Sequence, residues 1–414
     1  MINLKKSLRL KFLEKNKGDL VSGPFGSNIS AKYFVDEGIP VIRGNNLKSK
    51  SKYFIDDGFV FITESKAKEL IKCKAVKDDI IFTAVGTIGQ VGIIPKSTNF
   101  EYYIISNKQI RLRVDKDKAN PYFIFYQLRS KSLRKYLEGQ NRGSSVPLLN
   151  LGEIRNVPIK LPNLLTQKKV VAILSAYDDL INNNYQRIKL LEEIAEEIYK
   201  EWFVRFRFPE YKNAIFCDDK GSETPPQTIG SLPYGWRKIR FRKFIKLNRG
   251  FDLPNEKIIH GKYPVVASTS IKAFHNEYKV KAPCIVTGRS GSLGSVQFVN
   301  QNSWPLNTSL YVKDFMGNSV YFVYYFLKLL NLERYNSGAG VPTLNQNHLH
   351  GIQLNLPDKS LQQNFDEIIA PIFMEIDLLN KKNKLLQDTR DLILPRLISG
   401  KLSVEDLELE TLHI

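Results

Sequence analysis

Cysteine is scarce in this chain, and long apolar runs are missing. The three cysteines, Cys73, Cys217 and Cys284, lie far apart among 414 residues and form no CxxC pair. Their spacing argues against a disulfide framework and against a structural zinc site. No run of about 18 apolar residues predicts a membrane span, and the first twenty residues lack the apolar core of a signal peptide. We therefore expect a cytoplasmic protein.

Acidic residues are also in short supply. The chain has 61 Lys and Arg against 42 Asp and Glu, a net charge of +19, and its pI is near 9.5. Such an excess points to a polyanionic partner, most often nucleic acid, although acidic lipid or a generic basic protein are alternatives. The apolar content of 43% is typical of a folded protein, and this length predicts two or more domains.

The chain repeats itself over a long distance. Residues 145–162 read SVPLLNLGEIRNVPIKLP and residues 340–357 read GVPTLNQNHLHGIQLNLP, with six identities at an offset of 195 residues. Residues 80–94 match residues 284–299 at an offset of 205, which aligns two glycines of each loop. A drifting offset is expected when loops differ in length while secondary structure is kept. The sequence therefore predicts two copies of one plan.

Each half ends in a helical pattern. Short runs of Ile, Val, Phe and Tyr, broken by Gly and Asn, first predict strands. Apolar residues then recur at three- and four-residue spacing after Pro162 and Pro357, which predicts helices of about 50–60 Å. Pro371 should kink the second helix or mark the start of its main segment. Asn184 and Asn383 fall on or near the apolar seams, where a buried Asn fixes the register of a helix pair; a solvated turn is the alternative.

These patterns predict an α+β fold with two globular mixed α/β domains, each followed by a long helix. The segment 208–233 contains a Pro-Pro pair, glycines and acidic residues, and reads as a linker. The acidic tail should dock near the helices. The expected boundaries are 1–163 for the first domain, 164–207 for its helix, 208–233 for the linker, 234–357 for the second domain, 358–400 for its helix and 401–414 for the tail.

Candidate catalytic and metal-binding motifs are weak. Asp57, Glu64 and Lys66 superficially suit a metal-dependent nuclease, but this pattern is common in basic chains and has no counterpart in the second half. His348 and His350 could hold a metal, yet the first half has a glutamate and an arginine at the matching positions. No phosphate-binding loop or nucleophile motif is found. We predict that the chain has no catalytic residues and no metal site.

Polar loops at matching places in both halves are the candidate binding sites. Arg suits guanine, Asn and Gln suit adenine, Ser and Thr suit several bases, and Lys suits phosphate. Any single loop could be a simple turn, but its recurrence beside a charge of +19 favours contact with nucleic acid. The candidates in the first half are Arg43, Asn45, Asn46, Lys48, Thr87, Gln90, Arg142 and Ser144. Those in the second half are Ser268, Thr269, Lys272, Arg289, Ser290, Ser292 and Asn336.

The order and duplication of these features resemble the specificity (S) subunits of type I restriction-modification systems. The resemblance covers essentially the whole chain, and no single motif decides it. One departure is that LPYGW, residues 232–236, has no counterpart before the first half, so we expect the first domain to begin without that docking segment. The stretches that carry the resemblance are GIPVIRGNNL, GTIGQVG, SSVPLLN, QKKVVAILSAYDDLI, LPYGWRKI, GVPTLNQNHL and LILPRLISGKL.

The resemblance implies a non-catalytic reader of double-stranded DNA. Each globular segment would be a target recognition domain for half of a split site, and the helices would form an antiparallel coiled coil with a pseudo-twofold internal repeat. Two modification (adenine methyltransferase) subunits and the restriction (translocase and endonuclease) subunits would be its partners. S-adenosylmethionine, ATP and Mg would bind those partners, and no membrane would be involved. The alternatives are a stand-alone nucleic-acid-binding scaffold and a metal-dependent nuclease.

Overall fold

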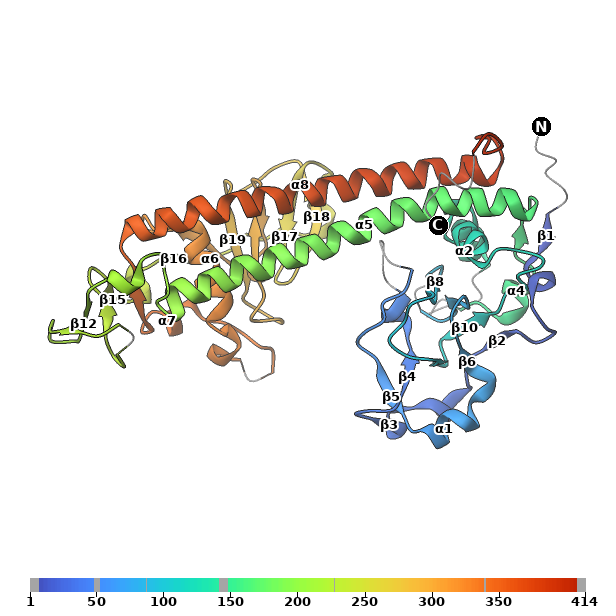
Figure 1. Cartoon of the computed structure of the whole chain (residues 1–414), viewed down its shortest axis with the longest axis horizontal. Helices are drawn as coiled ribbons and strands as arrows, with labels where there is room; N and C mark the ends of the chain where they lie inside the picture. The colour runs from blue at the N-terminus through green and yellow to red at the C-terminus, as the bar shows by residue number, and fades with distance from the viewer. Residues whose placement is uncertain are drawn as a thin grey trace. The chain divides into compact units, whose positions relative to one another are not determined.

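The chain folds into two compact units, which Figure 1 shows as a computed structural model. The structure describes residues 7–47, 53–86, 88–140, 148–226, 228–338 and 340–407. Unit 1 comprises residues 1–186 and 379–414, and unit 2 comprises residues 187–378. The boundaries fall inside the two long helices, whereas the sequence predicts them at the helix ends. The reason is that each helix packs its two ends into different cores.

Unit 1 contains two main sheets, with strand orders β2-β10-β7-β8 and β3-β5-β4-β9-β6. Strands β7 and β10 are buried along their whole length; β7 is apolar at its first three positions, whereas β10 buries Gln109 and Arg111 as well. The strands are β1 (Leu8–Arg9), β2 (Leu20–Ser22), β3 (Phe34–Val35), β4 (Ile39–Ile42), β5 (Val60–Ile62), β6 (Lys74–Ala75), β7 (Ile80–Thr83), β8 (Val91–Ile93), β9 (Tyr103–Ile105), β10 (Gln109–Leu112) and β11 (Pro158–Ile159). The short helices are α1 (Glu64–Glu69), α2 (Pro121–Arg129), α3 (Lys131–Gly139) and α4 (Leu151–Arg155).

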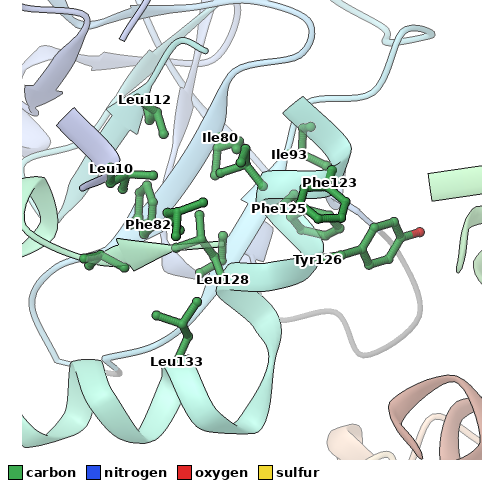
Figure 2. Packing of buried hydrophobic residues seen from close by; sticks show 14 of the residues in the cluster. Leu10, Ile80, Phe82, Ile93, Leu112, Phe123, Phe125, Tyr126, Leu128 and Leu133 are labelled. Atoms are coloured by element: carbon green, nitrogen blue, oxygen red, sulfur yellow. The ribbon is translucent and has the colours of Figure 1, made fainter. Parts of the chain in front are cut away.

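The main core of unit 1 lies between the first sheet and helix α2 (Figure 2). Val170 and Leu174 near the start of one long helix and Leu394 near the end of the other pack into the same core. Burying one such side chain stabilises the fold by about 1.5–3 kcal/mol. The residues that Figure 2 labels are Leu10, Ile80, Phe82, Ile93, Leu112, Phe123, Phe125, Tyr126, Leu128 and Leu133.

Unit 2 repeats this plan. Its first sheet has the order β16-β22-β19-β20, and its second sheet, β18-β17-β21, has a parallel pair where unit 1 pairs β4 with β9. The strands are β15 (Arg237–Arg240), β16 (Lys246–Arg249), β17 (Tyr263–Val266), β18 (Ile271–His275), β19 (Cys284–Gly288), β20 (Val296–Val299), β21 (Trp304–Pro305), β22 (Ser309–Asp314) and β23 (Gln353–Leu356). Its short helices are α6 (Val320–Leu329) and α7 (Gln346–Leu349).

The long helices are α5 (Leu164–Tyr199), which continues as a π-helical turn over Lys200–Val204, and α8 (Lys359–Ile398). The predicted helices 164–207 and 358–400 therefore agree to within a few residues. The prediction that Pro371 starts the main segment is wrong, because α8 begins twelve positions earlier and is unbroken at this proline. Within the described residues, no helix combines the length and the apolar character needed to cross a membrane.

Helices α5 and α8 pair in antiparallel order within unit 1. The Nδ2 atom of Asn184 donates to Oδ1 of Asn383 over 2.8 Å, and both residues are at most 4% exposed. Asp178 precedes Asn184 in α5, and it forms an ion pair with Arg390, which follows Asn383 in α8. The partners therefore run in opposite directions along the two helices. The predicted buried Asn pair is confirmed, and the alternative of a solvated turn is wrong.

The same order of helix contacts is found within unit 2. Arg187 of α5 forms an ion pair with Glu375 of α8 over 3.0 Å. Tyr199, later in α5, packs against Phe365, earlier in α8, with ring centroids 5.9 Å apart. Both units are therefore built on an antiparallel pair of helix segments.

A buried glutamine ties the first turn of each long helix to its unit. The side chain of Gln167 accepts a hydrogen bond from Asn120 N over 2.8 Å and donates to the carbonyl of Pro162 over 2.7 Å. Gln362 makes the same two bonds in unit 2. Its side chain accepts from Ser319 N over 2.8 Å and donates to the carbonyl of Pro357 over 3.2 Å. The repeated Leu-Pro is thus the junction between a sheet and its long helix.

One sequence expectation about the ends of the domains needs correction. The supposed linker 208–233 contains the small sheet β13-β12-β14 of β12 (Phe216–Cys217), β13 (Glu223–Thr224) and β14 (Leu232–Pro233). It forms because Phe216, which is 1% exposed, packs against Phe206. The first domain opens with strand β1, which pairs with β11 as β15 pairs with β23. Within its described residues, unit 1 has no counterpart of Trp236, which packs against Phe203 in unit 2.

The acidic tail docks as expected over its described part. Val404 is 2% exposed and belongs to the core of unit 1. Lys169 of α5 donates to the carbonyl of Glu405 over 2.7 Å. The remaining tail residues, 408–414, lie outside the described residues.

Candidate DNA interface

The repeated VP-x-LN stretch makes the same backbone contact in both units. Leu149 N donates to the carbonyl of Ala84 over 2.9 Å, and Leu344 N donates to the carbonyl of Arg289 over 2.8 Å. The donors are 195 residues apart and the acceptors are 205 apart, the two offsets seen in the sequence. Bridges between 85 and 148 and between 290 and 343 accompany these bonds. The stretch therefore pairs with a loop of its own unit that contains two glycines, Gly86 and Gly89 in unit 1 and Gly291 and Gly294 in unit 2. We call this loop the Gly loop.

The Gly loops adopt the same conformation in both repeats. Gly86 and Gly89 have φ of 94° and 83°, and Gly291 and Gly294 have φ of 87° and 84°. L-residues with a side chain rarely adopt these angles, which explains why both glycines are present in both copies. One turn has thus been built twice at the same place in the fold.

The Asn of each VP-x-LN stretch starts a short helix. Asn150 accepts from Glu153 N over 2.9 Å, and the Glu153 carboxylate accepts from Asn150 N in return, which is a capping box. Asn345 accepts from Asn347 N over 3.0 Å at the start of α7. These shared residues stabilise the fold by capping helices. The side chains that differ between the repeats are therefore the candidates for recognition.

In unit 1 the polar loops meet at one end of the first sheet. A Cβ atom on Gly44 would lie 3.7 Å from the side-chain oxygen of Gln90 and 3.9 Å from the side-chain amide of Gln109. We call residues 43–46, 84–86, 88–90 and 148–150 rim 1. Arg43 and Gln90 are half-buried there and Asn45 is exposed. The predicted residues Lys48, Thr87, Arg142 and Ser144 lie outside the described residues.

Asn46 is a structural residue and not a candidate reader. It is 1% exposed, and its Oδ1 atom accepts from Arg43 N over 2.9 Å. Its Nδ2 atom donates to the carbonyls of Ile55 and Asp57 over 3.1 and 3.0 Å. A side chain with these bonds already made, and no access to solvent, cannot also reach a base edge. The prediction of Asn46 as a reader is wrong because the loop that contains Ile55 and Asp57 covers its side chain.

In unit 2 the corresponding loops also meet. Arg289 N donates to the carbonyl of Thr308 over 2.9 Å, and Gly291 N donates to that of Pro342 over 2.9 Å. We call residues 268–270, 288–292, 336–338 and 340–343 rim 2. Ser268, predicted as a reader, is 8% exposed and donates to the Thr308 carbonyl over 2.8 Å, so it holds the rim together instead.

The other predicted residues of unit 2 differ in availability. Thr269 and Ser292 are exposed on rim 2, and Arg289 and Ser290 are half-buried there. The side chains of two other residues already make hydrogen bonds. Asn336 is exposed, but its Oδ1 atom accepts from two backbone amides of its own loop at 2.9 Å each. The ammonium of Lys272, on β18, donates to the side chain of Asn255 over 2.7 Å.

Two residues beside the rims were missed by the sequence reasoning. Arg134 packs on Gly89 in unit 1, and Glu333 packs on Gly294 in unit 2. The signal that could have found them is a short echo, LRKY at 133–136 and LERY at 332–335.

The nuclease candidates are engaged in local contacts. Asp57 accepts from the backbone of Gly58 over 2.6 Å. The ammonium of Lys66 forms an ion pair with Glu69 over 2.5 Å and lies 4.3 Å from the Tyr33 ring centroid. Over the described ranges, no group of three or more His, Cys, Asp or Glu residues could hold a metal ion. The contacts of these residues therefore do not support the nuclease alternative.

Burial also argues against thiol chemistry at two of the cysteines. It raises the pKa of the Cys284 thiol to about 11, with a smaller opposing effect of a hydrogen bond to Ser303. Burial likewise raises the pKa of Cys73. Reactive cysteines have lowered pKa values and solvent access, and these two have neither.

The fold and the two rims define an internally duplicated α+β protein in which each unit presents an equivalent set of polar loops beside a helix pair. The chain belongs to the family of type I restriction modification DNA specificity domains. The sequence profile of this family matches residues 24–193 and 233–388, so each match includes one rim and much of one long helix.

Relatives resemble the chain over most of its length. The type I restriction enzyme MjaIX specificity subunit of Methanocaldococcus jannaschii is 26% identical over 95% of this chain and 93% of that protein. The HindI specificity subunit of Haemophilus influenzae is 22% identical over 81% and 88%. The crystal structure of a type I restriction-modification S subunit from M. genitalium has a TM-score of 0.53 at 16% identity, covering 96% and 97%, and shares the fold.

Proposed function

We propose that the chain reads a split DNA site for a type I restriction-modification complex, with one half-site for each unit. The main supporting observation is that the two rims share their backbone structure but differ in their side chains. The Gly loops have the same turn and the same bond to VP-x-LN, but Ala84 and Val85 of rim 1 correspond to Arg289 and Ser290 of rim 2. Because base edges are read by side chains, two such faces would read different half-sites.

The helix pair would set the distance between the half-sites. A buried, hydrogen-bonded Asn pair is a known device for fixing the register of paired helices, and Asn184 with Asn383 is such a pair. Removing about seven residues from both helices should therefore change the spacer in the DNA site and leave both half-sites unchanged. A changed half-site in this variant would count against a spacing role.

The outer faces of the helices would bind the modification subunits. Leu385 and Leu392 of α8 in unit 1 are each 67% exposed, and Leu190 and Ile194 of α5 in unit 2 are 56% and 50% exposed. Exposed aliphatic clusters mark protein interaction sites. Leu190 and Leu385 are related by the offset of 195, which favours two copies of the partner. S-adenosylmethionine, ATP and Mg would then bind modification and restriction subunits, and this chain would be non-catalytic.

The test is co-expression with the cognate modification subunit, followed by sequencing of methylated bases in the host DNA. We expect one split motif with methylated adenine, and we expect the purified chain alone neither to methylate nor to cut DNA. Exchanging rim 1 for that of a relative should change one half of the motif only. Binding without methylation by the assembled proteins would favour a stand-alone scaffold. Metal-dependent cutting by the chain alone, lost in Lys66→Ala, would establish a nuclease.

A further inference from the structure

The residue that packs on the second glycine of each Gly loop has opposite charge in the two repeats. A Cβ atom on Gly89 would lie 3.0 Å from Cγ of Arg134, and one on Gly294 would lie 2.9 Å from Cγ of Glu333. Each side chain therefore runs across a glycine that leaves room for it. Both stand directly beside a rim.

The two positions are equivalent in the repeat. Residues 133–136 read Leu-Arg-Lys-Tyr and residues 332–335 read Leu-Glu-Arg-Tyr, at an offset of 199 that also relates the starts of α2 and α6. Leu133 and Leu332 are 9% and 1% exposed and belong to the cores of their units. The leucines fix the register of both segments, so the next residue is placed alike. The one change of charge in these four residues falls on Arg134 and Glu333.

Both charged groups are available to a ligand. The Arg134 side chain is 53% exposed and forms an ion pair with Glu138 on the same helix face, over 3.1 Å. Exposed pairs of this kind contribute little and exchange readily for another partner. Glu333 is exposed, and within the part of the chain that the structure describes its carboxylate makes no hydrogen bond or ion pair.

The two groups cannot suit the same base. A guanidinium donates two hydrogen bonds to the O6 and N7 atoms of guanine, whereas a carboxylate accepts from the N4 amino group of cytosine. A carboxylate is also repelled by phosphate, so in contact with DNA it is favoured where a base amino group faces it. We propose that Arg134 and Glu333 are specificity-determining residues, Arg134 for guanine in the half-site of unit 1 and Glu333 for cytosine in that of unit 2. This inference rests on the proposed function.

The test uses the complex of the full chain with its modification subunit and a library of DNA sites with randomised half-sites. Arg134→Gln and Glu333→Gln make the two positions identical, and glutamine pairs with adenine. We expect each variant to lose preference for its original base by roughly 5- to 150-fold at one position of one half-site, with a gain for adenine. The other half-site of each variant should be unchanged.

Lys135→Ala and Arg334→Ala are matched controls, because these neighbours are basic in both repeats. We expect them to weaken binding to all sequences and to lower the salt dependence without changing base preference, as phosphate contacts do. If Arg134→Gln and Glu333→Gln behaved like the controls, or bound as the original does, the inference would be wrong. A complex that read no split site at all would overturn the proposed function too, so the two failures are distinguishable.

Discussion

Replacing Asp178 by alanine should destabilise unit 1 by about 3–5 kcal/mol. The Asp178 side chain is 1% exposed and forms an ion pair with Arg390, whose side chain is 6% exposed. It also accepts from the hydroxyl of Tyr126 over 2.8 Å. Removing one partner of a buried pair costs about 3–5 kcal/mol, because the other charge is left buried without compensation.

Two neighbours of the pair change this cost in opposite directions. Arg390 keeps a second partner in Asp391 over 2.9 Å, and the Asp391 side chain is 45% exposed. Arg129 increases the cost of removing Asp178. Burial lowers the pKa of Arg129, and the negative charge of Asp178 opposes that shift by stabilising the charged guanidinium. Without Asp178, two guanidinium groups would remain close together in the interior.

The second repeat supplies a matched control. At the offset of 195, Asp178 corresponds to Phe373 and Arg390 to Ala195. Phe373 packs against Tyr325, with ring centroids 6.2 Å apart, where Asp178 contacts a tyrosine in unit 1. The double variant Asp178→Phe with Arg390→Ala copies the second repeat and should recover most of the loss, because apolar replacements of buried ion pairs are often neutral.

Stability should be measured on the full chain by native-state hydrogen exchange, because two units need not unfold in one transition. Amides of β7 and β10 report on unit 1, and amides of β19 and β22 serve as the internal reference in unit 2. We expect Asp178→Ala to lower protection in unit 1 alone. A loss under about 1 kcal/mol, or a double variant no more stable than Asp178→Ala, would refute the reasoning.

Three further predictions concern buried polar groups. Asn184→Ala should cost about 1–3 kcal/mol in urea unfolding, because the Asn383 amide nitrogen already lacks a partner and its oxygen would lose one; no change would mean that water enters the seam. Gln167→Ala and Gln362→Ala should each cost about 1–3 kcal/mol, visible in hydrogen exchange only in the unit concerned. Cys284, with a pKa of about 11, is about one part in a thousand thiolate at pH 8, so a thiol reagent should label it only after denaturation.

Much of the fold followed from the sequence because it is written in local patterns. Apolar spacing predicted α5 and α8 to within a few residues, and the duplicated stretches predicted two copies of one plan. The buried pair of Asn184 and Asn383 was also predictable, because a helical period shows which residues share a face. The unit boundaries were not, because periodicity does not show which core receives each end of a helix.

The candidate sites were predicted only in outline. Polar loops at matching places in both halves were predicted, but Asn46 and Ser268 were taken for readers and are buried. Nothing local distinguishes them from Asn45 and Thr269, their exposed neighbours. The small sheet in 208–233 was missed for a similar reason, since the burial of Phe216 depends on aromatic residues outside the segment.

By itself the sequence determined the repeated plan, the long helices, the basic charge and the places where polar loops occur, because spacing and composition are properties of a linear chain. Only the tertiary structure decided which polar side chains remain available to a partner. It joined Leu149 to the Gly loop, buried Asn46 under a later loop, and left Arg134 and Glu333 exposed on equivalent glycines. The physical reason is that a polar atom is free or engaged according to contacts between residues far apart in the sequence.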